Sequence, residues 1–126
     1  MRWEAVRVAR PPDLDIAPLP IGKDDALTLH LSGELSVWTM PTLRDEVVHR
    51  CRNGNRRLRL DLSGVSVCEV ATLYGLIGLM HGVHAARGYM CLIALSDAVM
   101  QAMTRSGLDP RVLLWDLFRD SRQVRS

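Results

Sequence analysis

The chain has 126 residues, of which 48% are hydrophobic and 24% charged, and its formal net charge at pH 7 is +2. This length fits one compact domain, and the hydrophobic share excludes a wholly disordered chain. The small net charge argues against a nucleic-acid partner, and no apolar run approaches the roughly 20 residues that span a bilayer. We therefore expect a cytoplasmic protein with no secretion segment and no direct membrane insertion.

Prolines set the start of the domain. Pro11 and Pro12 prevent a helix, so residues 1–12 are interpreted as an N-terminal arm. The domain itself is expected over residues 13–121, with a short tail at 122–126.

Two strands are predicted at the start of the domain. Residues 14–19 are interpreted as an edge strand, and residues 22–25 as a turn. Leucine then alternates with polar residues over 27–31, which is the period-two pattern of a half-buried strand, and Gly33 is expected to end it. A small antiparallel hairpin at this point would make the sheet mixed.

The first helix has clear start and stop signals. Thr39 is a candidate N-cap, and Pro41 occupies a favoured first position. Asn53 and Gly54 supply the stop. Four apolar residues fall on one helical face: Leu43, Val47, Val48 and Cys51.

A second alternating strand is predicted over 58–62, followed by a turn at Ser63 and Gly64 and a short apolar stretch at 65–68. Residues 70–87 then form a helix that is apolar nearly all round and is ended by Gly88. Such a helix should be buried by its own domain on one side and need a partner on the other.

The remainder continues the alternation of strands and helices. Residues 90–95 are interpreted as a central strand covered on both faces, and Ser96 and Gly107 should cap and end a third helix. Residues 112–115 could form a last strand and Leu117 could begin a final helix. This order predicts an α/β fold whose small, mixed, mostly parallel sheet is covered by about four helices.

Catalytic and metal-binding patterns are absent from the sequence. Cys51, Cys68 and Cys91 lack metal-ligand spacing and are expected to be buried thiols, while His81 and His84 have no nearby ligands to complete a set. No glycine-rich phosphate loop or nucleophile elbow is found. We therefore expect no enzyme activity, no catalytic residue, no metal and no cofactor.

Three segments resemble the STAS family of anti-sigma-factor antagonists. Residues 29–36, LHLSGELS, are similar to a strand that ends in Gly-Glu-Leu-Asp in the family, although Ser36 replaces the aspartate. Residues 60–69, LDLSGVSVCE, are similar to the family's LDLSGVxFxD segment. Residues 88–108 match its glycine, buried strand, helix and SGL tail. The resemblance covers about residues 13–120 and implies the family's STAS-like fold.

The resemblance also implies a working loop after the third strand. In the family, a pattern like Asp-Ser-Ser-Gly-Leu places a phosphorylatable serine at the start of a helix, and phosphate breaks the complex with a kinase-type anti-sigma factor. Here Ala71 stands at the acceptor position and Thr72 at the glycine position. The implied partner-binding residues are Ser66, Glu69, Val70, Ala71, Thr72 and Leu73.

Two interpretations of this loop remain open. In the first, Ala71 lacks a hydroxyl and locks the domain in the unphosphorylated, binding-competent state. In the second, Thr72 or Ser66 takes the phosphate instead, and Thr72 would sit near a helix N-terminus, where a phosphate is favoured. The charge of Glu69 beside the site favours the first interpretation.

The resemblance therefore implies a non-catalytic regulator that binds an anti-sigma factor or related kinase-like protein and thereby alters bacterial transcription; a homodimer is compatible with it. An alternative is a scaffold subunit of a larger assembly, such as a stress-sensing complex or a lipid transporter, with no phosphorylation switch. A small-molecule sensor is a third hypothesis, for which the predicted loops offer few convergent polar groups.

Overall fold

The structure is a computed structural model that describes residues 13–108. Within them, strands and helices follow in the order β1 (Leu14–Pro18), β2 (Leu27–Leu35), α2 (Met40–Arg52), β3 (Arg57–Cys68), α3 (Val70–Ala85), β4 (Tyr89–Leu95) and α4 (Asp97–Ser106). The strands form one sheet in the order β1-β2-β3-β4, in which β1 and β2 are antiparallel and the other pairs are parallel. The predicted mixed, mostly parallel α/β sheet is confirmed.

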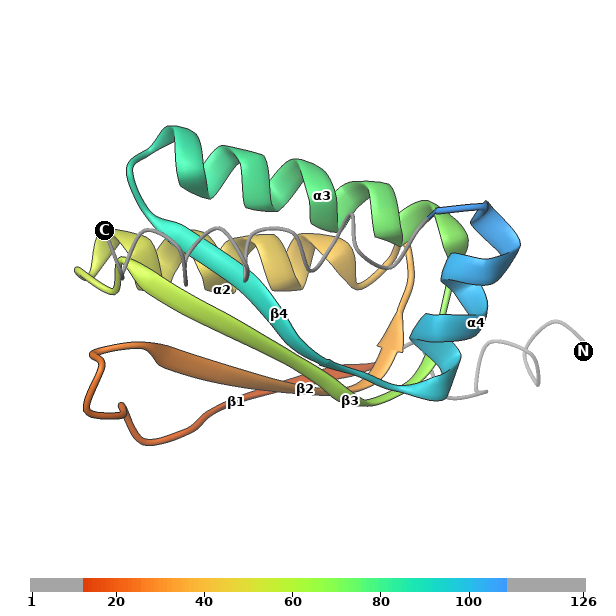
Figure 1. The fold of residues 1–126 in the computed structure, drawn as a ribbon, viewed down its shortest axis with the longest axis horizontal. Helices are drawn as coiled ribbons and strands as arrows, with labels where there is room; N and C mark the ends of the chain where they lie inside the picture. The colour runs from red at the N-terminus through yellow and green to blue at the C-terminus, as the bar shows by residue number, and fades with distance from the viewer. Residues whose placement is uncertain (1–12, 109–126) are drawn as a thin grey trace, which may run out of the picture.

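Within residues 13–108, helices cover one face of the sheet (Figure 1). Helices α2 and α3 lie side by side over it, and α4 packs where β3 and β4 end (Figure 1). The alternating leucines of β2 and β3 point into the layer between sheet and helices and are fully buried. Their polar neighbours, among them His30, Arg59 and Asp61, lie on the opposite face and are only partly buried, as the period-two pattern predicts.

Two glycines that were predicted to end strands instead lie within them. Strand β2 continues past Gly33 to Leu35, and β3 runs unbroken through Ser63 and Gly64 to Cys68. A Cβ atom on Gly33 would come within 2.3 Å of the Asp13 carbonyl oxygen, and one on Gly64 within 2.8 Å of the Leu31 carbonyl oxygen. These glycines mark close approach between neighbouring strands, which the sequence does not distinguish from a turn.

Thr39 stands at the N-cap position of α2 as predicted, but its side chain does not cap the helix. Its hydroxyl makes no N-cap hydrogen bond to α2. Instead, Oγ1 accepts a hydrogen bond from the Ser36 N–H at 2.9 Å and donates one to the Glu34 carbonyl oxygen at 2.8 Å. The hydroxyl therefore fastens the turn that precedes the helix, while proline does occupy the first turn of α2 as predicted.

In the second half of the domain, helix α4 agrees with the prediction and strand β4 differs from it. The Ser96 side chain accepts a hydrogen bond from the Val99 N–H at 3.2 Å, and Gly107 ends α4 with φ of 79°, so both signals are confirmed. Strand β4 was predicted to be central but lies at the edge of the described sheet. Its apolar run reflects burial of residues 90–92, which does not reveal how many strands it pairs with. The strand predicted at 112–115 and the helix from Leu117 lie outside the described residues.

Helix α3 does not present a continuous face of large apolar side chains to solvent. Its buried side carries the large residues Leu73, Leu76, Met80 and Val83. Its exposed side is mostly glycine and alanine, with Tyr74 as the exposed large hydrophobic side chain of the helix. The apolar character read from the sequence therefore comes from burial on one side and from small residues on the other.

Candidate functional site

The segment between β3 and α3 is tied to the end of β2 by Glu69. This residue has an extended backbone (φ −79°, ψ 140°), and its N–H donates to the Leu35 carbonyl oxygen at 2.9 Å. Its carboxylate makes no cap on α3 but accepts a hydrogen bond from the Val37 N–H at 2.9 Å. One side chain thus holds the β2–α2 turn against the start of α3.

That turn is built so that its tip faces outward. Ser36 and Thr39 are both buried, and the Ser36 hydroxyl accepts a hydrogen bond from the Trp38 N–H at 3.1 Å. The Thr39 N–H donates to the Ser36 carbonyl oxygen at 3.1 Å, which closes the turn. With both ends anchored in the core, Val37 and Trp38 stay at the tip, and Trp38 is 75% exposed.

Two residues predicted to contact a partner lie in the core instead. Thr72 is 1% exposed, and its hydroxyl donates to the Glu69 carbonyl oxygen at 2.6 Å and lies 3.6 Å from the Cys68 Sγ. Leu73 is fully buried. The resemblance identifies the segment by its place in the sequence, whereas the helical period turns these two side chains toward the sheet.

The other four predicted residues reach the surface. Ser66 and Ala71 are exposed, as is Glu69, and Val70 is half-buried against the core. The Ser66 hydroxyl donates to the Gly33 carbonyl oxygen at 3.2 Å. Ala71 therefore offers a methyl group at the position where the resemblance places a phosphate acceptor.

Exposed apolar side chains surround these residues. Tyr74 is 54% exposed, and Val37 and Val67 are also among the exposed large hydrophobic residues. We define the recognition patch as Val37, Trp38, Val67, Ala71 and Tyr74.

Contacts hold together the segments that carry the members of the patch. Val67 pairs with Glu34 in the β2–β3 register, three residues before Val37. The Glu69 carboxylate joins the Val37 backbone to the start of α3. Next to Tyr74, a Cβ on Gly75 would lie 3.0 Å from the Met40 Cε, so the first turns of α2 and α3 are in contact.

Sequence reasoning missed four members of the patch. Val37, Trp38 and Tyr74 lie outside the motifs that carry the resemblance, and Val67 lies within residues 60–69, a motif that does not show which of its side chains are exposed. The available signal was the apolar pair Val37–Trp38 in the connection between the predicted strand end at Gly33 and the candidate N-cap Thr39, where polar residues are usual.

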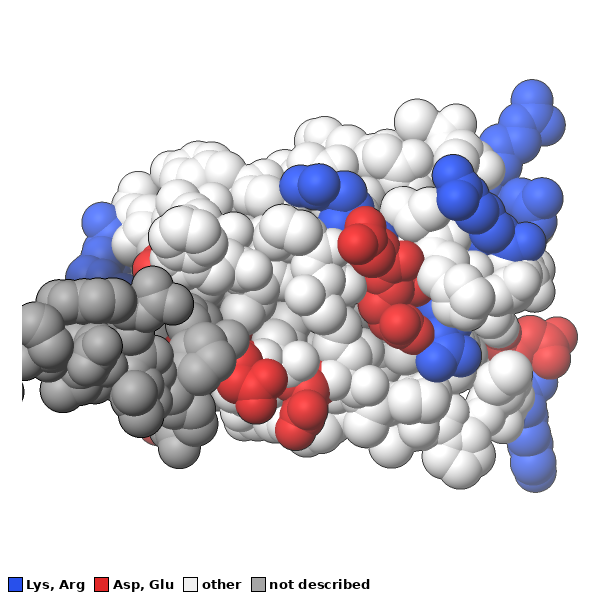
Figure 2. All heavy atoms as spheres, turned by 180° about the vertical axis from the view of Figure 1, so that it is seen from behind, with Lys and Arg blue, Asp and Glu red and all other residues white. Residues whose placement is uncertain are grey.

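An acidic cavity of about 420 Å³ borders the patch. Its lining includes the carboxylates of Asp13, Asp15 and Glu34 together with Ser66 and Val67, so the two surfaces share Val67. By contrast, arginines gather at the other end of the molecule, where α2 ends and β3 begins (Figure 2). The patch is therefore an apolar surface with an acidic margin.

The thiol of Cys68 lies beside the patch and is buried. Burial raises the pKa of the Cys68 thiol, which disfavours the nucleophilic thiolate at neutral pH. Among residues 13–108 no three His, Cys, Asp or Glu side chains are grouped to hold a metal ion. In the same range no helix has both the length and the apolar character needed to cross a bilayer.

Comparison with known proteins agrees with this fold. A family model described as the STAS domain matches residues 18–123. A solved variant of RsbS from Moorella thermoacetica is 18% identical with a TM-score of 0.61, covering 88% of this chain and 98% of that one. The anti-sigma factor antagonist SpoIIAA in its unphosphorylated form is 18% identical with a TM-score of 0.58, covering 76% and 84%. An anti-sigma factor antagonist from Mycobacterium paratuberculosis is 16% identical with a TM-score of 0.58, covering 79% and 83%.

Proposed function

The chain belongs to the STAS domain family, and on that premise we propose that it is a non-catalytic anti-sigma-factor antagonist. It binds a kinase-type anti-sigma factor in the cytoplasm and so controls bacterial transcription. The observation that carries this proposal is the recognition patch, in which Trp38 is held 75% exposed by two buried, hydrogen-bonded turn residues.

Physical chemistry favours a protein as the ligand of this patch. Exposed aromatic side chains on a rigid support lose little conformational entropy on binding, and Trp and Tyr are the residues most enriched among binding hot spots. The patch is a surface of side chains from the β2–α2 turn, β3 and α3, which suits a flat complementary surface. Its acidic margin selects a partner with arginine or lysine beside an apolar region.

Because Ala71 has no hydroxyl, the proposed regulator has no phosphorylation switch at the family's acceptor position. A phosphate would add about two negative charges next to Glu69 and the acidic cavity, and so repel a partner chosen for basic groups. With alanine there, the domain stays in its binding-competent state, and control must come from its abundance or from the partner.

Quantitative pull-down with purified chain as bait tests the proposal. The wild type should retain a sigma-related or histidine-kinase-like protein from native lysate, and Trp38→Ala should weaken that affinity at least about tenfold, as expected for a hot spot of about 2 kcal/mol. Ile21→Ala is the matched control, because Ile21 is also exposed but lies in the hairpin at the opposite end of β2. Equal retention by Trp38→Ala would contradict the proposed surface.

Size-exclusion chromatography separates this function from that of a scaffold subunit. An exchangeable regulator should elute alone as a soluble monomer or a defined homodimer. A chain that aggregates until its partner is added would instead support a permanent subunit of a larger assembly. The small residues on the outward side of α3 favour the first outcome, because permanent interfaces bury larger apolar side chains.

A further inference from the structure

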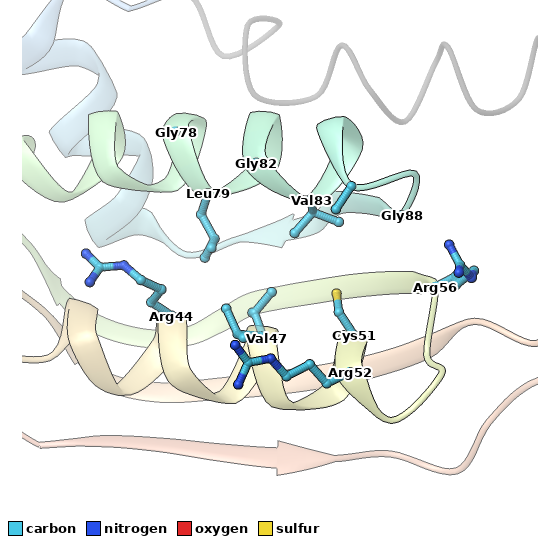
Figure 3. Close-up of a pocket in the computed structure, with 12 residues that line it drawn as sticks. Arg44, Val47, Cys51, Arg52, Arg56, Gly78, Leu79, Gly82, Val83 and Gly88 are labelled. Atoms are coloured by element: carbon cyan, nitrogen blue, oxygen red, sulfur yellow. The ribbon is translucent and has the colours of Figure 1, made fainter.

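A groove of about 550 Å³ runs between α2 and α3, away from the recognition patch. Leu79 and Val83 point from α3 toward α2, and Val47 and Cys51 point back from α2 (Figure 3). Its size and apolar walls are those of a small-molecule site, which typically measures about 300–1,000 Å³.

Glycine keeps this groove open. Gly78 and Gly82 line it, and a Cβ atom on either would meet nothing within 4 Å. A glycine inside a helix destabilises it by about 0.5–1 kcal/mol relative to alanine. Packing against the described chain does not require glycine at these two positions, and larger side chains there would narrow the groove.

The charge of the groove is entirely positive. Arg44, Arg52 and Arg56 border it, and none of the described residues that line it is acidic. Within residues 13–108 the guanidinium groups of Arg44 and Arg52 have no ion-pair partner, and Arg56 donates one hydrogen bond to the Arg87 carbonyl oxygen at 3.3 Å. Most of their N–H donors are therefore available to an anion.

From this geometry we infer that the α2–α3 groove binds a medium-chain fatty acid, with the alkyl chain between the helices and the carboxylate on the arginines. The groove spans nine residues of α2, from Arg44 to Arg52, a rise of about 12 Å along the helix, which is shorter than a docked protein helix requires. The chain's own remaining segments do not complement its charge. Residues 1–12 carry three arginines and one glutamate, and residues 109–126 carry four arginines and three aspartates.

Isothermal titration calorimetry of the full chain with decanoate tests the inference. We expect saturable binding at one site per chain. Decanol, which lacks the charge, and decyltrimethylammonium, which reverses it, should bind at least about tenfold more weakly. The inference is overturned if decanoate gives no saturable heat or if decanol binds equally well.

Variants locate the site. Gly78→Leu should fill the groove and abolish decanoate binding while the helix stays folded, since leucine is the better helix former. Arg52→Glu should weaken binding about tenfold. Lys23→Glu is the matched charge control, because Lys23 is exposed in the hairpin turn and does not line the groove. Unchanged affinity in Gly78→Leu would place decanoate elsewhere and overturn the inference.

Cys51 provides an independent measurement, because it lines the groove and is half-buried, whereas Cys68 and Cys91 are buried. Peptide mass spectrometry follows the rate at which N-ethylmaleimide alkylates Cys51. This rate should fall in proportion to the fraction of sites that decanoate occupies. An alkylation rate that decanoate does not change would contradict binding in this groove. Neither experiment involves a protein partner, so its failure leaves the proposed regulatory function intact.

Discussion

Two adjacent residues at the start of α3 differ in what they present to a kinase. Ala71 is exposed but has no hydroxyl, and Thr72 has a hydroxyl that is buried and hydrogen-bonded to the Glu69 carbonyl oxygen. A kinase needs an accessible hydroxyl in a segment it can bind. The rotation of about 100° between successive helical residues therefore separates the accessible position from the available hydroxyl group.

Intact-mass analysis after incubation with the co-purified partner and ATP tests this separation. The native chain should remain unphosphorylated, and Ala71→Ser should become mono-phosphorylated, because it restores a hydroxyl at the exposed position. Ala71→Ser combined with Thr72→Val should behave like Ala71→Ser alone. A phosphate mapped to Thr72 or to the exposed Ser66 of the native chain would contradict this assignment.

The same residues show what the sequence could and could not predict about the site. The resemblance located the segment, and the structure places Ser66, Glu69 and Ala71 of that segment at the surface. It did not separate Thr72 and Leu73 from their exposed neighbours, because the identity of a motif carries no information on the direction of each side chain. Trp38 is brought to the patch by hydrogen bonds of Ser36 and Thr39, which no local pattern reveals.

At the scale of elements, a histidine–aspartate contact joins β2 to β3 on the solvent-facing side of the sheet. His30 and Asp61 are paired in the register, and His30 Nδ1 lies 3.3 Å from Asp61 Oδ2. Partial burial tends to raise the pKa of Asp61, but hydrogen bonds from Ser63 and the interaction with His30 outweigh it, so the net pKa is below the ordinary 3.8. The ionised form is therefore stabilised by folding.

This shift predicts how Asp61→Asn changes stability with pH. Because the folded pKa is lowered, the contribution of Asp61 is fully present above pH 3.8 and is lost as the pH falls through the lower folded value. Urea unfolding should show a loss of about 0.5–1 kcal/mol at pH 7 and a smaller loss below pH 3.8. Asp45→Asn, on the exposed side of α2, is the control. A loss that does not shrink with acid would contradict the pairing.

Elements with local determinants were the most predictable. Helix α4 begins at Ser96 and ends at Gly107 as predicted, because caps act within one turn of the chain. Strand order was harder. The apolar run of β4 correctly indicated burial, but its place at the edge depends on hydrogen bonds between distant segments. Gly33 and Gly64 likewise depend on strands that meet only after folding.

At the scale of the whole molecule, two candidate binding surfaces lie on different parts of the same helix layer. The recognition patch gathers at the first turn of α3 and the carboxyl ends of β2 and β3, with an acidic margin. The α2–α3 groove follows the later turns of α3 and is bordered by arginines. Because the acidic residues and the arginines lie at different places on the surface, each of the two surfaces attracts a different class of ligand.

Site-specific photo-crosslinking in cells tests most directly that the patch contacts another protein. Benzoylphenylalanine at Tyr74 should yield a single crosslinked adduct, identified by mass spectrometry as a sigma-regulating, kinase-like protein, whereas the same group at Ile21 should yield none. No adduct at Tyr74, or the same adduct from both positions, would contradict the account.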